Sequence, residues 1–380
     1  MGNCDSSTGN THIKYISKHD KTENFTSFSS NSLPILSENY FNQNNDVHRL
    51  LKKNNSTNKT NPLENKQYLL PERIAKREDI TKKYKISKNV LGDGATSLVL
   101  YAENNKREKF AIKRIPKSKI IKKQEIAIKE AEICLKLEHK NIIKYYEIYE
   151  DINYIYIVME LGATDLFELI VNSPNGQIQE DLAIDFLIQI FEVIDYLHNV
   201  QNIVHCDIKP ENFIVKFDDK NKEKIILKLI DFGNIRKKPI SKERLLNFSG
   251  TKEYMAPETL ENYGFNEKID EWAAGIIMYN LLTGCDPFSA DTDSDYKDNI
   301  KFKNIKFEYI KNESLRELNK KLLNRYISKR ITAKEALEEI KKIKANLNNN
   351  NNNNNMNVFD NTKKKRKYLK YISSQLTNID

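Results

Sequence analysis

The sequence predicts an α+β protein with two lobes, in which strands come first along the chain and helices follow. Segments of alternating or continuous bulky apolar residues predict strands at residues 85–101, 109–115 and 153–159. One helical pattern at residues 122–137 lies among these strands, and helices predominate at residues 179–344. Strands followed by helices are typical of α+β domains. Hydrophobic residues make up 39% of the 380 residues, which is enough to build a large core.

The N-terminal part of the chain contains little that could belong to such a core. Asn, Ser, Thr and Lys dominate residues 3–61, where apolar residues are few. Such a segment cannot bury enough surface to offset the entropy that it loses on ordering. We therefore expect residues 1–80 to form a disordered polar tail, and we regard a small folded module there as the weaker alternative.

The first six residues match a lipidation pattern. Gly2 with Ser6 fits N-myristoylation and Cys4 suits palmitoylation, although a chance Met-Gly start is the alternative. One myristoyl chain holds a membrane only marginally, so a second lipid on Cys4 would matter physically. The four cysteines lie far apart without metal or redox spacing, and no secretory signal opens the chain. We expect an intracellular, cytoplasmic protein that is attached peripherally to a membrane.

The net charge of +9 bears on the binding partners, and the C-terminal composition bears on the division of the chain into domains. Lysines are mixed with Asp and Glu, and no basic-aromatic pattern indicates nucleic-acid binding. We expect a folded domain at residues 84–345, an Asn-rich linker at 346–357 and a basic, helical segment at 358–380. The basic run at 363–367 is most simply a solvated face, with nuclear targeting or anionic-lipid contact as weaker alternatives. We expect a monomer without a nucleic-acid partner.

A glycine-containing loop joins the first two predicted strands. It comprises residues 91–99, with Gly92, Gly94 and, in place of a third glycine, Ser97. Glycines let the backbone approach a phosphate closely enough for its N–H groups to bind. A strand follows the loop where a dinucleotide-binding fold would have a helix. The loop alone is a weak signal, because such turns are frequent.

The next strand and helix place a lysine and a glutamate where they can pair. Lys113 lies within an apolar strand, and a buried lysine needs a partner or loses its charge. Glu130 falls on the apolar stripe of the following helix, whereas Glu125 and Glu132 do not. This position favours an ion pair between Lys113 and Glu130 over a surface pair without function.

A polar loop after the long helix at residues 179–199 has the side chains for phosphate chemistry. Asp207 could accept the proton of an attacking hydroxyl, and Lys209 could stabilise charge on the transferred phosphate. Asn212 could bind a magnesium ion, and Asp231 offers a second ligand at the end of a later strand. Two oxygen ligands together with phosphate oxygens suit Mg²⁺, which rarely takes an all-protein site.

These motifs, in this order and at these spacings, resemble those of the eukaryotic protein kinases. The resemblance covers about residues 84–345 and includes the Asp-Phe-Gly sequence at 231–233 and the Ala-Pro-Glu sequence at 256–258. Arg330 resembles the family's arginine that pairs with the glutamate of the latter motif. The resemblance implies a bilobal fold with a small, mostly β N-lobe that has one helix and a larger, mostly α C-lobe. It favours the serine/threonine class, to which residues 209–212 are similar.

The family resemblance assigns a role to each matching residue. It makes Asp207 the catalytic base, aided by Lys209, while Lys113, oriented by Glu130, holds the α- and β-phosphates of ATP. The implied ligands of Mg²⁺ are Asn212 and Asp231. In the adenine site, Met159 would be the gatekeeper and the backbones of Glu160 and Gly162 would bind the adenine edge. The implied ATP-binding residues are Leu91, Gly92, Asp93, Gly94, Ala95, Thr96, Ser97, Val99, Ala111, Lys113, Met159, Glu160, Gly162, Asp165 and Ile214.

One departure from the family pattern affects regulation. Cys206 stands where most members have an arginine, and that arginine usually pairs with a phosphorylated activation loop. A phosphate on Ser241, Ser249 or Thr251 would therefore lack its main cationic partner. We expect activity to depend only weakly on phosphorylation of this loop, and we expect Cys206 to be structural rather than reactive.

Features outside the catalytic motifs indicate a branch of the family. Residues 129–142 are similar to those of calcium-dependent protein kinases, and residues 358–377 are similar to the junction before their calcium lobes. The acidic stretch at residues 291–295 does not form an EF-hand loop, because Tyr296 occupies the position of the required glycine. We expect either a truncated member of this branch or one whose calcium-sensing lobe lies on a partner chain.

The favoured function is transfer of the ATP γ-phosphate to Ser or Thr hydroxyls of protein substrates, in signalling at a membrane surface. A pseudokinase is one alternative, but pseudokinases usually lack at least one member of the catalytic set, which is complete here. A membrane-tethered scaffold that acts through its tails is the other alternative. For a scaffold, deletion of a tail would abolish function and the substitution Asp207→Asn would not.

Overall fold

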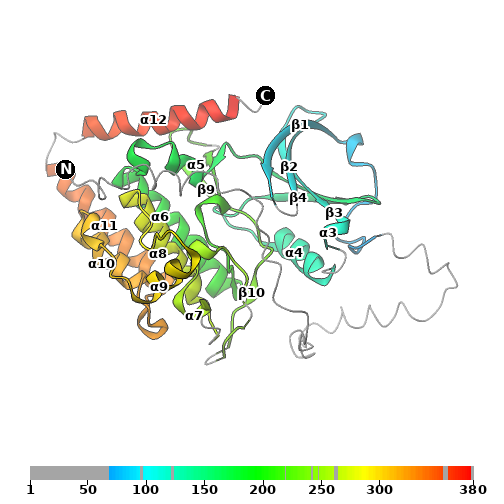
Figure 1. Cartoon of the computed structure of the whole chain (residues 1–380). Coiled ribbons are helices and arrows are strands. Elements are labelled where there is room, and N and C mark those ends of the chain that lie inside the picture. Colours follow the sequence, from blue (N-terminus) through cyan, green and yellow to red (C-terminus); the bar gives the residue numbers. More distant parts are fainter. Residues whose placement is uncertain are drawn as a thin grey trace.

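The computed structural model has two lobes, a small one rich in strands and a large one rich in helices (Figure 1). It describes residues 68–94, 97–120, 124–218, 220–240, 243–246, 248–260, 264–353 and 358–377. Side chains are described for these residues except at positions 124–127, 129–130, 350–353 and 358–365. The predicted lipidation sites Gly2 and Cys4, the loop residues Ala95 and Thr96, and the side chain of Glu130 therefore lie outside the description.

The small lobe is built on an antiparallel sheet of five strands in the order β1-β2-β3-β5-β4. Because side chains alternate between the faces of a strand, Phe110 and Ile112 point to one side and Ala111 and Lys113 to the other. Two helices, α3 (Lys117–Ile120) and α4 (Gln124–Lys136), follow the third strand. The strands are β1 (Tyr84–Asp93), β2 (Leu98–Asn104), β3 (Lys109–Pro116), β4 (Tyr145–Glu150) and β5 (Tyr154–Glu160).

The large lobe is arranged around two helices, α6 (Glu180–Asp195) and α8 (Lys268–Thr283). The predicted apolar face of α6, which includes Phe186 and Ile190, is fully buried. Gly275 lets another helix lie close to α8, because a Cβ atom there would come within 2.9 Å of the Leu322 side chain. The remaining helices are α5 (Leu166–Val171), α7 (Pro257–Leu260), α9 (Asp293–Phe302), α10 (Glu313–Leu322), α11 (Ala333–Asn353) and α12 (Val358–Thr377).

Two small sheets lie in the large lobe, and strands of both flank the loop that carries Asp207. One is three-stranded in the order β6-β8-β9 and the other pairs β7 with β10. Between α6 and β7 the helix widens into a π-helical turn at Tyr196–Val200. Such turns often occur at functional sites, and here the turn carries the buried His198. The strands are β6 (Thr164–Asp165), β7 (Ile203–Val204), β8 (Phe213–Phe217), β9 (Ile225–Leu229) and β10 (Arg236–Lys237).

The boundaries at both ends of the folded domain differ from the sequence prediction. Residues 68–80, which were expected in the disordered tail, are ordered and include the buried side chains of Leu70 and Ile74. At the other end, α11 continues to Asn353 and so takes in much of the expected Asn-rich linker. The composition is polar in both places, so it predicted disorder at one end and a linker at the other. Packing on the domain orders the first segment, and the second continues an existing helix.

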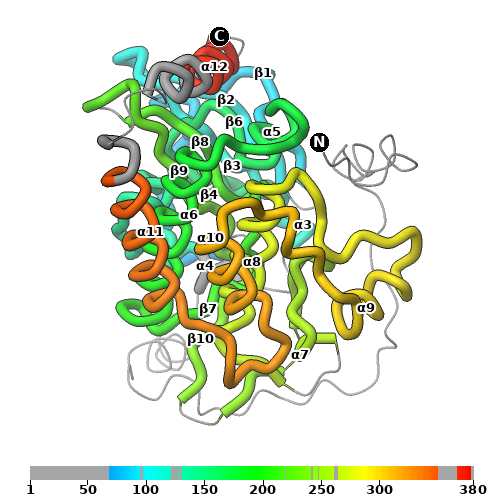
Figure 2. Tube along the Cα trace, turned by 90° about the vertical axis from the view of Figure 1, so that its left-hand side faces the viewer, coloured from blue at the N-terminus to red at the C-terminus, as the bar shows by residue number. Residues whose placement is uncertain are grey.

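The last helix, α12, packs against the large lobe beside α5 (Figures 1 and 2). Ile372 is fully buried, and the hydroxyl of Tyr368 accepts a hydrogen bond of 3.1 Å from the backbone N–H of Gln179. Both residues belong to the main core cluster of this lobe. Within the described part of the chain, no helix is long and apolar enough to cross a membrane.

Candidate active site

The glycine loop closes the hairpin between β1 and β2. The backbone N–H of Gly94 donates to the carbonyl oxygen of Ser97 at 2.9 Å, which holds the two sides of the loop together. A Cβ atom on Gly92 would lie 3.8 Å from that of Val99, an ordinary contact. The packing of the hairpin therefore does not itself require glycine at position 92. A close approach by a phosphate group explains this residue better.

An apolar cluster lies between the lobes beneath this hairpin. Ala111, Ile143 and Met159 are its buried members, and Leu91, Val99, Tyr145, Leu161 and Ile230 pack against them. Five strands and loops thus supply apolar side chains to one place, which suits a flat heteroaromatic ring. Sequence reasoning missed Ile143 and Ile230. The position of Ile230 directly before Asp231 could have indicated it, because the end of a strand that carries a ligand also lines the site.

The segment after β5 connects the lobes and is held by charge pairs. Lys216 and Lys228 both contact the carboxylate of Glu160, Lys228 at 3.2 Å. The backbone N–H of Glu160 donates to the carbonyl oxygen of Lys144 at 2.9 Å. Gly162 is required here, because a Cβ atom would lie 1.8 Å from the side chain of Ile214. The predicted ATP residues Glu160, Gly162 and Ile214 therefore meet at one turn.

Asp165 has a structural role that the sequence did not reveal. Its carboxylate caps the N-terminus of α5 by accepting a hydrogen bond of 2.8 Å from the backbone N–H of Glu168. Burial raises the pKa of Asp165 to about 6, and the nearby charges of Glu168 and Glu211 act in the same direction. One carboxylate oxygen is thus used within the fold, and a contact to a ribose would have to share this group.

Lys113 of β3 and Asp231, which follows β9, form an ion pair. The Lys113 Nζ atom lies 3.4 Å from Oδ1 of Asp231, and this ammonium lowers the pKa of the carboxyl group. Asp231 has a left-handed backbone with φ of 64°, a strained conformation that is concentrated at functional sites. The next residue, Phe232, is fully buried and packs edge-on against His205. This packing fixes the backbone beside Asp231, while the side chain of Asp231 itself is 46% exposed.

The carboxylate of Asp207 already binds a hydroxyl group. Its Oδ1 atom accepts hydrogen bonds from the hydroxyl of Thr251 at 2.7 Å and from the backbone N–H of Thr251 at 3.0 Å. Lys209 donates to the same hydroxyl at 2.6 Å. A carboxylate and an ammonium therefore act together on one hydroxyl oxygen. A serine or threonine substrate would present the same group to the same pair.

A hydrogen bond fixes the orientation of the side-chain amide of Asn212. Its Nδ2 atom donates to the backbone carbonyl of Asp207 at 2.8 Å, and the residue is buried. The donors needed by a hard cation are oxygens, and Asn212 and Asp231 supply an amide oxygen and a carboxylate. The residues present therefore fit Mg²⁺, which would complete its shell with phosphate and water oxygens.

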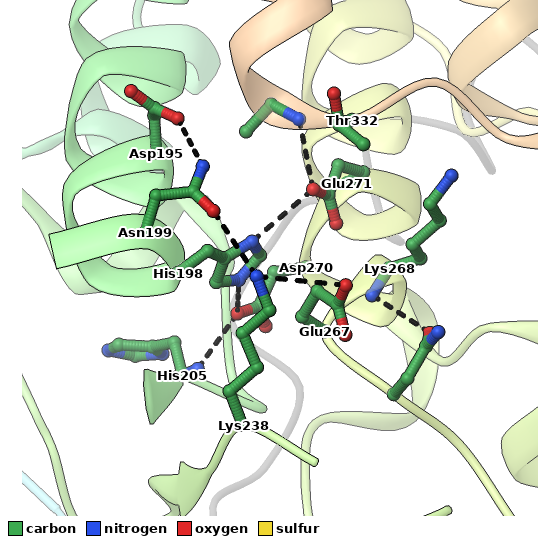
Figure 3. Close-up of polar contacts among 12 residues, drawn as sticks. Asp195, His198, Asn199, His205, Lys238, Glu267, Lys268, Asp270, Glu271 and Thr332 are labelled. Carbon is green, nitrogen blue, oxygen red and sulfur yellow. Dashed lines mark hydrogen bonds and ion pairs between the residues drawn. The ribbon is translucent and has the colours of Figure 1, made fainter. Parts of the chain in front are cut away.

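The loop that carries Asp207 is fixed from behind by a buried charge network (Figure 3). Asp270 accepts the backbone N–H groups of His205 at 2.8 Å and of Cys206 at 2.9 Å. His198 contacts Asp270 at 2.9 Å and Glu271 at 3.3 Å. Burial opposes protonation of His198, but Glu271 and Asp270 outweigh it and raise its pKa to about 10. His198 is therefore a buried cation between two carboxylates.

Sequence reasoning missed His198, although a signal was present. It lies four residues after the buried Ile194, so the helical period already placed it on the inner face. The thiol of Cys206 is buried and its backbone has φ of 67°. Burial raises the pKa of this thiol well above its usual value, so the group stays protonated.

A second buried ion pair joins helix α7 to the segment just before α11. Arg330 and Glu258 form two parallel bonds of 2.7 and 2.9 Å, the pair expected from the sequence. Arg330 also donates to the backbone carbonyls of Asn324 and Lys268. Bidentate pairing with additional carbonyl acceptors gives a buried arginine the geometry that it needs.

Comparison with known proteins explains this set of residues. Residues 84–340 match the family model described as the protein kinase domain. The chain belongs to the protein kinase family. The strand-rich N-lobe and helical C-lobe are those of a protein kinase domain, so the predicted bilobal α+β fold is confirmed.

Several curated kinases are similar to this chain. Calcium-dependent protein kinase 4 of Plasmodium falciparum is 32% identical over 309 residues, which cover 77% of this chain and 57% of that protein. The serine/threonine-protein kinase dkf-2 of Caenorhabditis briggsae is 34% identical over 248 residues, or 63% of this chain and 20% of the relative. Myosin light chain kinase A of Dictyostelium discoideum is 37% identical over 209 residues, or 54% and 68%. These relatives confirm the predicted resemblance to serine/threonine kinases of the calcium-dependent and calmodulin-dependent kinds.

The matches cover only part of each of these relatives, so they describe the kinase domain and not the whole proteins. The chain spans 20% and 57% of the lengths of the C. briggsae and P. falciparum kinases. In the protein kinase family, the residues gathered here correspond to the lysine of the third strand, the catalytic-loop aspartate and asparagine, and the metal-binding aspartate. The structure brings Lys113 to Asp231 and Asp207 to Asn212.

Proposed function

We propose that this chain is an active serine/threonine protein kinase that uses ATP and Mg²⁺. The observation that carries the proposal is the hydroxyl of Thr251, which the structure holds between the Asp207 carboxylate at 2.7 Å and the Lys209 ammonium at 2.6 Å. This is the environment that an attacking substrate hydroxyl needs. The complete catalytic set favours this function over a pseudokinase, which keeps the fold as a binding module.

In the proposed reaction the substrate hydroxyl takes the place of Thr251 beside Asp207. Its oxygen forms a bond to the γ-phosphorus of ATP, the bond to the bridging oxygen of ADP breaks, and the hydroxyl proton passes to Asp207. Lys209 stabilises the negative charge on the transferred group, and Lys113 holds the remaining phosphates. When bound, Mg²⁺ neutralises phosphate charge, and Asn212 and Asp231 are the residues that would hold it. Catalysis then consists mainly of positioning and electrostatics.

The surroundings of Asp207 favour substrates with basic residues near the target hydroxyl. Glu211 has a buried Oε2 atom without a hydrogen-bond partner in the described structure, and burial raises its pKa. Lys209 opposes this rise in the pKa of Glu211, whereas the nearby charges of Asp207 and Glu253 add to it, and Glu211 in turn raises the pKa of Asp165. A guanidinium or ammonium group of a substrate would offset the cost of burying negative charge at Glu211.

This preference is tested with two peptides that differ only in arginine or alanine before the serine. We expect Glu211→Gln to raise KM for the arginine peptide about tenfold and to leave the alanine peptide unchanged, since charge-assisted contacts contribute about 1.5–3 kcal/mol. Glu223→Gln, at an exposed position, is the control. Equal effects on both peptides would contradict the basic preference.

We further propose that the protein signals at a membrane surface through lipids on Gly2 and Cys4. The support is the sequence pattern at the N-terminus, since one acyl chain alone binds only marginally. In flotation with phospholipid vesicles after expression in cells that contain both N-myristoyltransferase and palmitoyltransferases, the wild type should float and Gly2→Ala should remain in solution. Flotation of Gly2→Ala to the same extent as the wild type would refute this localisation.

A calcium-sensing partner is the last part of the proposal. The relative from P. falciparum is named as a calcium-dependent kinase. Helix α12 exposes the basic residues Arg366, Lys367 and Lys370, which suit an acidic partner. Calcium-loaded calmodulin is a convenient probe, and we expect it to change the rate of transfer. Equal rates with this probe and with chelator would contradict a role for such a partner.

The experiment that tests the catalytic proposal is transfer of labelled phosphate from ATP to a panel of basic peptides and casein. The wild type is compared with Asp207→Asn, with calcium and with chelator. We expect the variant to lose at least about 100-fold in rate, because a positioned base contributes 10²–10⁴-fold. Wild-type transfer no greater than that of the variant, with ATP binding intact by thermal shift, would refute the active kinase and leave the pseudokinase.

A further inference from the structure

The described chain begins with a segment that covers one edge of the N-lobe sheet. We call residues 68–83 the N-terminal clasp. The backbone of Lys76 donates to the carbonyl of Ile148 and accepts from the N–H of Glu150, each at 2.9 Å, so the clasp pairs with β4. Because β4 is an edge strand of the sheet, this pairing satisfies backbone groups that would otherwise face solvent.

The carboxylate of Glu150 is the anchor of the clasp. Its side chain is fully buried, and it accepts hydrogen bonds from the backbone N–H groups of Leu69 and Leu70, the latter at 3.0 Å. Lys117 contacts it at 2.9 Å, and Arg77 pairs with it and also donates to the carbonyl of Leu70. Burial opposes ionisation of Glu150, but these donors together lower its pKa. A buried carboxylate with four donors is a specific attachment point.

A second carboxylate of β4 fastens the other end of the clasp. Glu147 accepts hydrogen bonds from Lys76 at 2.6 Å, Lys83 at 2.7 Å and the Tyr84 and Tyr149 hydroxyls at 2.9 Å. Burial again opposes ionisation, and the hydrogen bonds lower the pKa of Glu147 to about 2. The clasp is therefore fixed to the sheet at both ends.

The middle of the clasp contacts helix α4. Leu70, Ile74 and Ala75 share one apolar cluster with Ala131 of α4, and Ile128 of that helix packs against the cluster. The other members of the cluster come from the sheet: Ile148, Ile155 and Ile157. A surface ion pair adds to this contact.

The ion pair joins Arg73 of the clasp to Glu132 of α4, and the two side chains are 50% and 24% exposed. Farther along, Cys134 of α4 and Leu137, directly after its end, belong to the core cluster of the C-lobe. The helix is therefore held by the clasp and sheet through one part and by the C-lobe through another. Its orientation depends on both attachments.

The position of α4 matters because of what this helix carries. Glu130 lies on it, directly before the clasp contact Ala131, and is the expected partner of Lys113. In protein kinases the phosphate-binding lysine works only when the glutamate of this helix is in place. Loss of the clasp contact would let α4 move without unfolding the domain.

We propose that the N-terminal clasp is a positioning element for phosphoryl transfer, which keeps α4 in the orientation that lets Glu130 support Lys113. This inference rests on the proposed kinase activity, although the contact between clasp and helix does not. It assigns a catalytic consequence to residues that precede the matched kinase domain at 84–340. Arg73 and Ile74 act through α4 and are positioning residues.

The test uses charge reversal at the exposed ion pair, because such changes leave the fold intact. Variants Arg73→Glu and Glu132→Arg are compared with the doubly reversed protein, and Lys321→Glu on the C-lobe is the matched control. We measure kcat and KM for ATP and for a peptide, together with hydrogen exchange of the amides in residues 128–136. Ile74→Ala provides a second, apolar perturbation of the same contact.

We expect each single reversal to lower kcat/KM for ATP by about threefold to tenfold, as befits an exposed pair turned repulsive. KM for the peptide should stay unchanged, exchange in residues 128–136 should rise, and the double reversal should restore both within twofold. Single reversals that change neither ATP kinetics nor exchange would overturn the proposal, as would a double reversal that restores nothing. A wild type without any transfer would refute the proposed function, and the exchange data would still decide whether the clasp holds α4.

Discussion

Substitution of His198 by glutamine tests the buried network behind the catalytic loop. His198, Asp270 and Glu271 are each 2% exposed or less. The imidazole lies 2.9 Å from Asp270 and 3.3 Å from Glu271. Glutamine keeps a hydrogen-bond donor of similar length but removes the positive charge, so two carboxylates would share a site without a cation.

The expected cost is large for a single substitution. Removing one partner of a buried ion pair typically costs about 3–5 kcal/mol, because the other charge stays buried and uncompensated. Each kcal/mol lowers Tm by about 2–4 °C in a domain of this size. We therefore expect His198→Gln to unfold roughly 6–20 °C below the wild type.

The pH dependence identifies the charge as the cause. The folded-state pKa of His198 is raised from 6.5 to about 10, so the folded protein keeps a proton that the unfolded chain releases. The stabilisation by His198 is fully present below pH 6.5 and is lost as the pH rises towards 10. The difference in unfolding free energy between wild type and His198→Gln should accordingly be largest near pH 6 and smaller at pH 9.

The assay is urea unfolding followed by fluorescence at several pH values. The chain has one tryptophan, and Trp272 is fully buried next to Glu271, so its emission reports the C-lobe. Groups that titrate in both proteins cancel in the difference. A His198→Gln protein whose unfolding free energy stays within about 0.5 kcal/mol of the wild type at pH 6 would refute a buried cation. A difference that does not change with pH would assign the effect to packing instead.

Three further substitutions follow from the site. Arg330→Met should lower the unfolding free energy by about 3–5 kcal/mol, because Glu258 would remain buried without its partner, and urea unfolding measures this. Gly162→Ala should raise KM for ATP at least about tenfold, since its Cβ atom would meet Ile214 at 1.8 Å and displace the turn; unchanged ATP kinetics would contradict this. Ser249→Ala should retain activity within about tenfold in a transfer assay, because Cys206 stands where the phosphate-binding arginine would be.

The sequence predicted most of the fold because its signals were local and repeated. Alternating residues around Lys113 gave the central strand, and the helical period of residues 179–199 gave the buried face of α6. Motif spacing likewise indicated Asp207, Asn212 and Asp231 before their geometry was known. These residues are close in the chain or fixed by a family pattern, so no long-range packing had to be inferred.

What the sequence did not reveal depends on contacts between distant residues. Leu70 and Ile74 stand in a polar stretch, and only their packing on α4 and the sheet shows that they are buried. Asp165 was expected only as an ATP-binding residue, whereas its hydrogen bond from the N–H of Glu168 shows that it also caps a helix. Neither the polarity of the neighbouring sequence nor a match to a family position determines which atoms a side chain contacts.

Two features bear on what orders the catalytic loop: Cys206 stands in place of an arginine, and His198 behind the loop carries a buried charge. In most family members a phosphate on the activation loop, held by that arginine, helps to order the catalytic loop. Here Asp270 accepts a hydrogen bond of 2.9 Å from the backbone N–H of Cys206, and His198 contacts the same carboxylate at 2.9 Å. Because these contacts lie within the core, we expect them to persist whether or not the loop is phosphorylated. The order of the catalytic loop would then come from folding, and we expect regulation to act elsewhere, for example on the orientation of α4.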